Sequence, residues 1–501
     1  MMIHKDAIIF GLLLVFQGSL LFAQEDQGAL KTNEKISNEM PSDGSHRFTL
    51  DLKKDQFALL KLTQRGIDLV ITTYDPAGEK LEDFDSPNGQ NGPEFITVVS
   101  DKAGEYTLEV KPLGASQEEG RYDLEILRVE ARAMTREGQV DQLFVLWDNR
   151  DSPGAAVSIV RDGEIVYKNG YGMANLEYDI PITPATIFHI ASVSKQFTAF
   201  SILLLEQEGK LKLDDDIRMY IPEVPDFGKT ITLRHLANHT SGLRDQWNLL
   251  ALAGWRLDDV ITKEHILKLV SRQQELNFDP GDEYLYCNTG FTLLAEVVAR
   301  VSGQSFARFT AERIFKPLNM SNTLFYDDHE MIVKNRAYSY HQDSAGYKKS
   351  VLSYANVGAT SLFTTVEDLS RWALNFEDPV VGDAGMVQKM QTRAVLNHGD
   401  TINYALGQSL YLYKGIKAAG HGGADAGYRT QIMRLPGQRF SVIVFSNLAS
   451  FNPSAMANKI ADLYLADEWP AKAPGEELPA EVSEDKEPET EVTGISMDAD
   501  T

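Results

Sequence analysis

The chain has 501 residues, of which 43% are hydrophobic, and it carries a formal net charge of −24 at pH 7. This length and apolar content allow two or more domains with buried cores, and the single cysteine, Cys287, excludes an intramolecular disulfide. The negative charge argues against nucleic acid as a partner, because phosphate binding requires clusters of Lys and Arg.

Residues 1–23 have the pattern of a secretory signal peptide. His4 and Lys5 precede an apolar run from Ala7 to Phe16, and a second apolar patch leads to Ala23. Polar and small residues interrupt this run, which makes it short for a permanent membrane anchor. We therefore expect cleavage near Ala23, export to the periplasm or the exterior, and no stable membrane anchor afterwards.

Residues 44–130 are predicted to form a separate all-β unit, and residues 24–43 are expected to be a linker before it. In segments 106–110 and 122–126, apolar and polar residues alternate with the two-residue period of a half-buried strand. Turn signals at 75–78 and 87–89 separate such runs. We therefore expect a jelly-roll-like β-sandwich here.

Three phrases in this unit resemble the pre-peptidase C-terminal (PPC) domain, an accessory domain of secreted peptidases. They are Asp68-Leu69-Val70-Ile71, Tyr74-Asp75-Pro76-Ala77-Gly78 and Ala103-Gly104-Glu105-Tyr106-Thr107-Leu108. The resemblance implies a role in surface binding, secretion or stability. The residues do not name the partner of the β-sandwich, and a plain spacer is the alternative.

A buried helix is predicted directly after the string Ser192-Val193-Ser194-Lys195. Residues 197–205 are apolar almost all round, which is typical of a helix at the centre of a large domain. Because residues three apart share a helix face, Lys195 can direct its amine at the Ser192 hydroxyl. A serine hydroxyl needs a neighbouring base, and burial lets a lysine act as one. The alternative is an ordinary helix cap beside a solvated lysine.

Two further strings follow in the chain, Tyr286-Cys287-Asn288 and His421-Gly422-Gly423. Each has an ordinary structural interpretation as well. Tyr286 could be a core tyrosine, Asn288 a turn former, and His421 a surface histidine beside a glycine-rich turn. Together with Ser192 and Lys195, however, they have the composition of a serine acyl-transfer site.

With these motifs the chain resembles the superfamily of serine beta-lactamases, D-alanyl-D-alanine carboxypeptidases, esterases and D-aminopeptidases, in its class C-like branch. Connecting phrases at 231–243 and 315–320 agree with it, and we place this domain at residues 135–467. The expected fold is α+β, with an antiparallel sheet flanked by helices. Strands are predicted at 155–160 and 441–445 and a helix at 261–275.

The resemblance implies a role for each motif. Ser192 would be the acylated nucleophile, and Lys195 and Tyr286 would share the proton transfers as a coupled pair. The backbone N–H groups of Ser192 and Ala424 would form the oxyanion hole.

The same resemblance implies a substrate-binding side of the site. Asn288 would bind the substrate's amide, and His421 would lie across the cleft on an edge strand. The residues expected on this side are Asn288, His421, Gly423 and Ala424.

His421 affects the expected substrate. Relatives with lysine at this position offer a permanent positive charge to a substrate carboxylate, whereas histidine is mostly neutral at pH 7. Carboxylate binding is therefore expected to be weaker, unless Arg429 compensates. We rank D-amino-acid peptidase or carboxypeptidase and esterase equally, with beta-lactamase behind. A penicillin-binding-type envelope protein without turnover is the competing hypothesis.

Other chemistries find little support. No G-x-S-x-G string is present, so a nucleophile elbow is not available. His235 and His239 could face one metal, but no third ligand is evident, and we expect no metal and no organic cofactor. Residues 468–501 are rich in Glu, Pro and Ala, and we expect an acidic disordered tail.

Overall fold

The computed structural model describes residues 24–470, apart from 87–88, 115–118 and 344. The chain divides into an N-terminal unit, residues 1–132, and a C-terminal unit, residues 133–501. The expected signal peptide lies outside the described residues. So does the expected acidic tail beyond residue 470.

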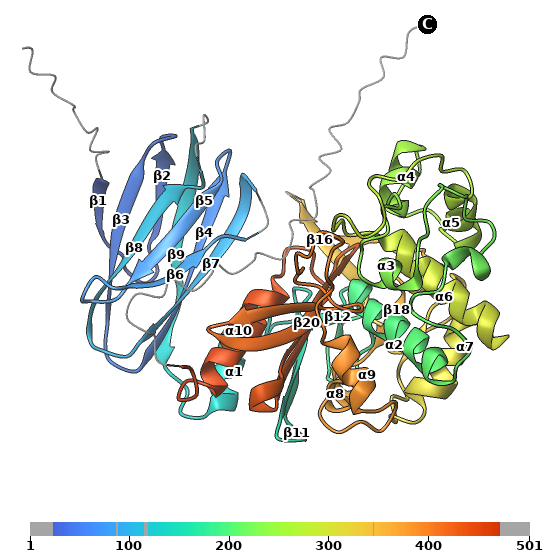
Figure 1. Ribbon diagram of the computed structural model, residues 1–501. Coiled ribbons are helices and arrows are strands. Elements are labelled where there is room, and N and C mark those ends of the chain that lie inside the picture. Colours follow the sequence, from blue (N-terminus) through green and yellow to red (C-terminus); the bar gives the residue numbers. More distant parts are fainter. Residues whose placement is uncertain (1–23, 87–88, 115–118, 344, 471–501) are drawn as a thin grey trace, which may run out of the picture. The chain divides into compact units, whose positions relative to one another are not determined.

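The N-terminal unit contains two sheets, antiparallel except for the parallel pair β1–β3 (Figure 1). One has the strand order β1-β3-β8-β5-β6 and the other the order β2-β9-β4-β7. The strands are β1 Gln24–Ala29, β2 Lys35–Met40, β3 Ser45–Leu52, β4 Gln56–Arg65, β5 Leu69–Tyr74, β6 Lys80–Phe84, β7 Asn91–Ser100, β8 Gly104–Pro112 and β9 Gly120–Ala131. The predicted β-sandwich is confirmed. Its resemblance to the PPC domain stays a prediction.

The alternation seen in the sequence is the alternation of the sandwich core. Tyr106, Leu108 and Val110 of β8 are buried, as are Tyr122 and Leu124 of β9. These side chains belong to one apolar cluster that both sheets contribute to. Successive strand residues point to opposite faces, so the polar residues between them face outward.

Residues 24–43 are not a linker but part of this sandwich. β1 pairs with β3 in parallel, and β2 pairs with β9 in antiparallel. In β2 only Met40 is fully buried, while the rest of the strand is exposed or half-buried. A strand with so few core positions lacks the apolar alternation by which a sequence signals a strand.

The C-terminal unit is built on a six-stranded antiparallel sheet, in the order β11-β10-β22-β21-β20-β19. Its strands are β10 Ala155–Arg161, β11 Glu164–Tyr171, β19 Ser409–Tyr413, β20 Ile416–Asp425, β21 Tyr428–Leu435 and β22 Phe440–Ser446. The strands predicted at 155–160 and 441–445 are β10 and β22. The short strands are β12 Met173–Asn175, β13 Ile180–Pro181, β14 Phe188–His189, β15 Leu324–Phe325, β16 Ser339–Asp343, β17 Gly346–Ser350 and β18 Leu362–Thr364.

Both faces of this sheet are buried. Alternate residues of β10, Ala155 and Val157, join a cluster with α1 and α10, whereas Ala156 and Val160 join the large cluster around α2 and α6. The helices are α1 Arg136–Leu143, α2 Ser194–Gln207, α3 Leu233–Ala237, α4 Gln246–Leu252, α5 Lys263–Val270, α6 Asn288–Ser302, α7 Phe306–Thr310, α8 Val366–Leu374, α9 Ala384–Met390 and α10 Pro453–Tyr464. The α+β arrangement is as predicted (Figure 1).

The helix expected at 261–275 is shorter than predicted. Ile261 forms a β-bridge with Tyr354, and α5 begins only after Thr262, which caps it together with His265. The helix ends at Val270. Long-range pairing of Ile261 therefore overrides its local helix pattern. In the part of the chain that the structure describes, no helix is both long and apolar enough to cross a bilayer.

Candidate active site

Ser192 lies in a short 3₁₀ turn, η1 Ala191–Val193, which leads directly into α2. Ala191 has a φ of +46°, a conformation that a residue with a side chain adopts at a cost. The Ala191 N–H donates to Nδ1 of His189 at 3.2 Å, and its carbonyl accepts from the Ser194 hydroxyl at 2.5 Å. Ser192 is half-buried, whereas the residues around it are buried. The turn thus holds this hydroxyl at the start of a buried helix, as the sequence predicts.

Lys195 lies one helical turn further along, fully buried. Its Nζ donates hydrogen bonds to Ser192 Oγ at 3.0 Å, to Asn288 Oδ1 at 2.8 Å and to the Ala359 carbonyl at 2.9 Å. An ammonium group has three donors and no acceptor, so Lys195 is the donor in each of these contacts.

The same geometry prepares Lys195 to act as a base. After losing one proton, the amine keeps two N–H groups and gains one lone pair. The Ala359 carbonyl and Asn288 Oδ1 can only accept, so they take the two N–H groups. The lone pair then faces Ser192 Oγ, which is the direction that proton removal from the serine requires.

The Tyr286 ring lies beside this lysine. Lys195 Nζ is 4.7 Å from the centre of the ring, within the range of a cation–π contact. The ring also packs against His239, with ring centres 4.2 Å apart. His239 Nδ1 also accepts the backbone N–H of Cys287 at 2.9 Å. Tyr286, which the sequence predicts to act together with Lys195, therefore lies next to it, and contact with His239 helps to hold the Tyr286 ring there.

Asn288 is the first residue of α6 and is 8% exposed. The sequence predicts that it binds the substrate's amide, but both ends of its side chain are bound within the protein. Oδ1 accepts from Lys195, and Nδ2 donates to Asp245 Oδ2 at 3.0 Å. Asn288 thus accepts a hydrogen bond from Lys195, and its predicted contact with the substrate's amide stays a prediction.

His421 lies in β20 and is 7% exposed. Its Nδ1 is 2.5 Å from the Gly422 carbonyl, which can only accept, so Nδ1 carries the proton. Nε2 then accepts from the Tyr404 hydroxyl at 3.0 Å. Burial, reinforced by the charge of Lys195, lowers the pKa of His421 to about 3. The ring is therefore neutral near pH 7 and supplies no positive charge.

β20 lies at the edge of the sheet only beyond Gly420. β19 pairs with β20 from Ile416 to Gly420, and no such pairing continues at His421, which was expected on an edge strand. Further along β20, Gly423 lies against the η1 turn, Ala191–Val193, which is called the nucleophile turn below because it contains Ser192, the proposed nucleophile. A Cβ at Gly423 would be 2.4 Å from the Ile190 carbonyl oxygen and 3.2 Å from the Ala191 Cβ. The absence of a side chain lets β20, with Ala424, run close to Ser192.

Arg429 is the cation that could compensate for a neutral His421. Its Nη1 donates to the carbonyls of Ala426 at 3.1 Å and Tyr428 at 2.8 Å, so the guanidinium is folded back on its own loop.

Four parts of the site were not predicted as such from the sequence. Asp245, His239, Tyr404 and the Ala359 carbonyl all contact residues that are distant in the chain. His239 stands out in the sequence as a possible metal ligand and as the start of the family-like phrase from His239 to Gly242. The position of this phrase three residues before Asp245 is the sequence signal that points to both residues.

One ring nitrogen of each paired histidine is bound within the protein. His235 Nδ1 accepts the backbone N–H of Thr232, and His239 Nδ1 accepts that of Cys287. Among the described residues, no group of three or more His, Cys, Asp or Glu side chains is placed to hold a metal ion.

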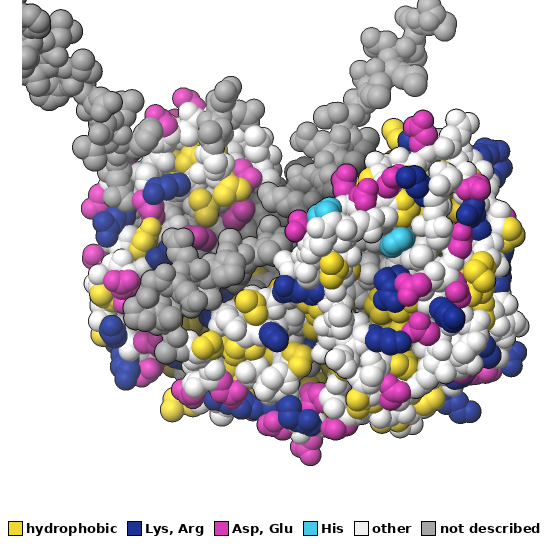
Figure 2. Space-filling model, viewed as in Figure 1, with side chains coloured by type: hydrophobic (Ala, Val, Ile, Leu, Met, Phe, Trp, Pro, Cys, Tyr) yellow, Lys and Arg dark blue, Asp and Glu magenta, His cyan; other side chains and the backbone are white. Residues whose placement is uncertain are grey.

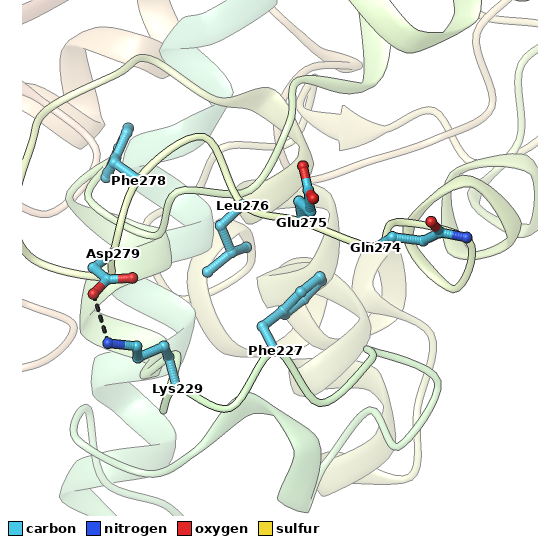
Figure 3. Close-up of a pocket in the computed structure, with 7 residues that line it drawn as sticks. All are labelled: Phe227, Lys229, Gln274, Glu275, Leu276, Phe278 and Asp279. Atoms are coloured by element: carbon cyan, nitrogen blue, oxygen red, sulfur yellow. Dashed lines mark hydrogen bonds and ion pairs between the residues drawn. The ribbon is translucent and has the colours of Figure 1, made fainter.

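A cavity of about 250 Å³ lies elsewhere in the C-terminal unit (Figure 3). Lys229 and Asp279 form an ion pair of 2.6 Å at its wall. The lining residues are Phe227, Lys229, Gln274, Glu275, Leu276, Phe278 and Asp279. Ser192, Lys195 and Tyr286 are not among them, so this cavity is separate from the site.

On the face shown in Figure 2, acidic and basic side chains are interspersed.

Buried neutral histidines predict a loss of stability in acid. Burial lowers the pKa of both His189 and His421 to about 3, against about 6.5 in the unfolded chain. The unfolded state therefore binds more protons between these values, and stability falls as pH decreases through this window. At pH 5 each histidine is expected to cost about 2 kcal/mol relative to pH 8. Urea unfolding at both pH values tests this.

His421→Gln should show a smaller difference in unfolding free energy between pH 8 and pH 5 than the wild type. The matched control is His398→Gln, because the His398 side chain is 54% exposed. An equal pH dependence in wild type and His421→Gln would contradict the prediction.

Comparison with known proteins finds relatives of the C-terminal unit. Over 310 residues the chain is 27% identical to a D-aminopeptidase from Gluconobacter oxydans, an alignment covering 62% of this chain and 58% of the relative. Over 315 residues it is 30% identical to a D-aminopeptidase from Brucella anthropi, covering 62% and 59%. The chain thus spans about three fifths of the length of these relatives.

Solved structures show the same fold. A penicillin-binding protein homologue from Pyrococcus abyssi is 28% identical with a TM-score of 0.59, covering 66% of this chain and 77% of that chain. A D-amino acid amidase from Ochrobactrum anthropi SV3 is 22% identical with a TM-score of 0.55, covering 66% and 99%.

A family model described as Beta-lactamase matches residues 135–467, the domain that the motifs delimited. The match extends over more than half of the chain and contains Ser192, Lys195, Tyr286 and His421. The chain therefore belongs to the beta-lactamase family.

Proposed function

We propose that the protein is a serine hydrolase that forms an acyl-enzyme at Ser192 from an amide or an ester. One observation carries this proposal: Lys195 Nζ lies 3.0 Å from Ser192 Oγ, with two acceptor-only partners that direct its lone pair at the serine. Membership of the beta-lactamase family and the likeness to D-aminopeptidases support it.

The proposed reaction has two halves. Lys195, coupled to Tyr286, removes the hydroxyl proton while Ser192 Oγ attacks the substrate carbonyl carbon. The N–H groups of Ser192 and Ala424 stabilise the oxyanion, and the same proton passes to the leaving amine or alcohol. Water then attacks the ester, giving up its proton to the pair, and Ser192 is released with its proton restored. Because the two groups are coupled, they titrate as a pair.

The proposed substrates are amides or short peptides of D-amino acids, followed by simple esters. His421 is neutral, so it supplies no charge for a substrate carboxylate, and the Arg429 guanidinium is turned toward its own loop. This disfavours carboxypeptidase substrates and beta-lactams, which carry a carboxylate near the reacting carbonyl. The names of the aligned relatives point in the same direction.

Mass spectrometry combined with steady-state kinetics tests the substrate class. We expect a fluorophosphonate adduct at Ser192 and faster turnover of D-alanine p-nitroanilide than of its L-isomer, an N-acetylated D-Ala-D-Ala peptide or a penicillin. Fast release of hydrolysed penicillin would make the protein a beta-lactamase instead. No adduct with any reagent would favour a binding protein without turnover.

We also propose that the protein is exported after cleavage near Ala23, because residues 1–23 have the pattern of a signal peptide. The intact mass of the protein recovered outside the cytoplasm should then lack these residues. Full-length protein confined to the cytoplasm would contradict export without affecting the proposed chemistry.

A further inference from the structure

Asp245 holds the starts of two helices. Its Oδ1 accepts the Trp247 N–H at 2.8 Å and so caps α4. Its Oδ2 accepts two hydrogen bonds from Asn288, one from the backbone N–H at 2.6 Å and one from Nδ2 at 3.0 Å. A single carboxylate therefore connects the loop before α4 to the first residue of α6.

This contact determines which way the Asn288 amide faces. An ionised carboxylate only accepts hydrogen bonds, so the NH₂ group of Asn288 must face Asp245. The amide oxygen is then on the opposite side, 2.8 Å from Lys195 Nζ. Because Asn288 is buried, solvent does not compete strongly for either end of the amide.

The orientation of the amide decides where the lone pair of Lys195 points. With Oδ1 facing the lysine, the lone pair of the neutral amine is left for Ser192. With the amide reversed, Nδ2 would donate to that lone pair and compete with the Ser192 hydroxyl. The amine would then be a weaker base toward the nucleophile.

We infer that Asp245 is a positioning residue for acyl transfer: it orients Asn288, and Asn288 directs the lone pair of Lys195 at Ser192. This inference rests on the proposed function and adds to it a residue that need not touch substrate. Asp245 lies outside the three sequence motifs that predict the site, at 192–195, 286–288 and 421–423.

Asp245→Ala should lower kcat about 10²-fold, because a small misorientation of a catalytic group costs this much. KM should change by no more than about twofold, since no contact with substrate is removed. The rate of Ser192 labelling by a fluorophosphonate should fall with kcat. Asp245→Asn keeps an oxygen acceptor and a helix cap, so its kcat should lie between those of Asp245→Ala and wild type.

Asp383→Ala is the matched structural control. Asp383 caps α9, which like α4 has seven residues, and its Oδ1 accepts the Met386 N–H at 2.9 Å. This variant should lose comparable stability and keep wild-type kcat and labelling rate. Equal effects of Asp245→Ala and Asp383→Ala would overturn the inference.

A double-variant test separates positioning from other effects. If Asp245 acts through Asn288, Asp245→Ala should reduce kcat by less than about threefold in an Asn288→Ala background. A further full loss there would overturn the inference. A wild-type protein that reacts with no reagent would overturn the proposed function and this inference together. A reactive wild type with an equally reactive Asp245→Ala variant would overturn the inference alone.

Discussion

Lys195→Met is expected to reduce acylation of Ser192 by about 10⁴-fold or more, the loss typical when one member of a coupled catalytic set is removed. Lys195 is fully buried, and its Nζ contacts Ser192 Oγ directly at 3.0 Å. Methionine has a similar volume and no charge, so it fills the buried site without the amine, although Asn288 Oδ1 and the Ala359 carbonyl lose a donor. The measurement is the rate of fluorophosphonate labelling, with circular dichroism to verify folding.

The double variant makes this prediction sharper. Ser192 and Lys195 act as one unit, so Ser192→Ala combined with Lys195→Met should be no slower in substrate hydrolysis than Ser192→Ala alone. Additive losses would mean that Lys195 contributes by another route. A Lys195→Met protein that is folded and labels at the wild-type rate would remove Lys195 from the mechanism.

Gly423→Ala is expected to damage both stability and activity. The new Cβ would lie 2.4 Å from the Ile190 carbonyl oxygen and from Thr430 Oγ1, so β20 and the nucleophile turn must move apart. Overpacking of this kind costs about 1–3 kcal/mol of unfolding free energy. Movement of the proposed oxyanion donor at Ala424 relative to Ser192 should lower kcat by about 10²-fold. Urea unfolding and steady-state kinetics measure the two effects.

Gly437→Ala is the matched control. A Cβ at Gly437 would meet no atom within 4 Å, so this variant should retain wild-type stability and activity. Wild-type behaviour of Gly423→Ala would mean that the close approach between β20 and the nucleophile turn can relax without consequence.

The sequence was sufficient for the parts of the site that depend on local geometry. Ser192 and Lys195 are three residues apart in an apolar segment, and helical spacing alone brings them to one face. The period-two alternation around Tyr106 and Tyr122 likewise depends on local strand geometry, and the sandwich core contains these residues. The family was recognisable because its motifs are short strings in a constant order.

Tertiary contacts decided what these residues can do chemically. Asp245 and Asn288 are 43 positions apart, and Lys195 and Ala359 are 164 apart, so no local pattern links them. His421 is neutral because burial lowers the pKa of its ring, and Nε2 accepts a hydrogen bond from Tyr404. The ordinary pKa of a histidine side chain does not include this effect of burial. Residues 24–43 joined the sandwich through pairing with β3 and β9 rather than through their own polar pattern.

The sequence by itself therefore determined the family, the order of the two units and the proximity of the Ser192 hydroxyl to the Lys195 amine, because each depends on short-range spacing or on a characteristic string. The tertiary structure decided the direction of the Lys195 lone pair and the charge of His421. Hydrogen-bond direction and desolvation depend on which distant groups surround a side chain, and only the folded chain brings those groups together.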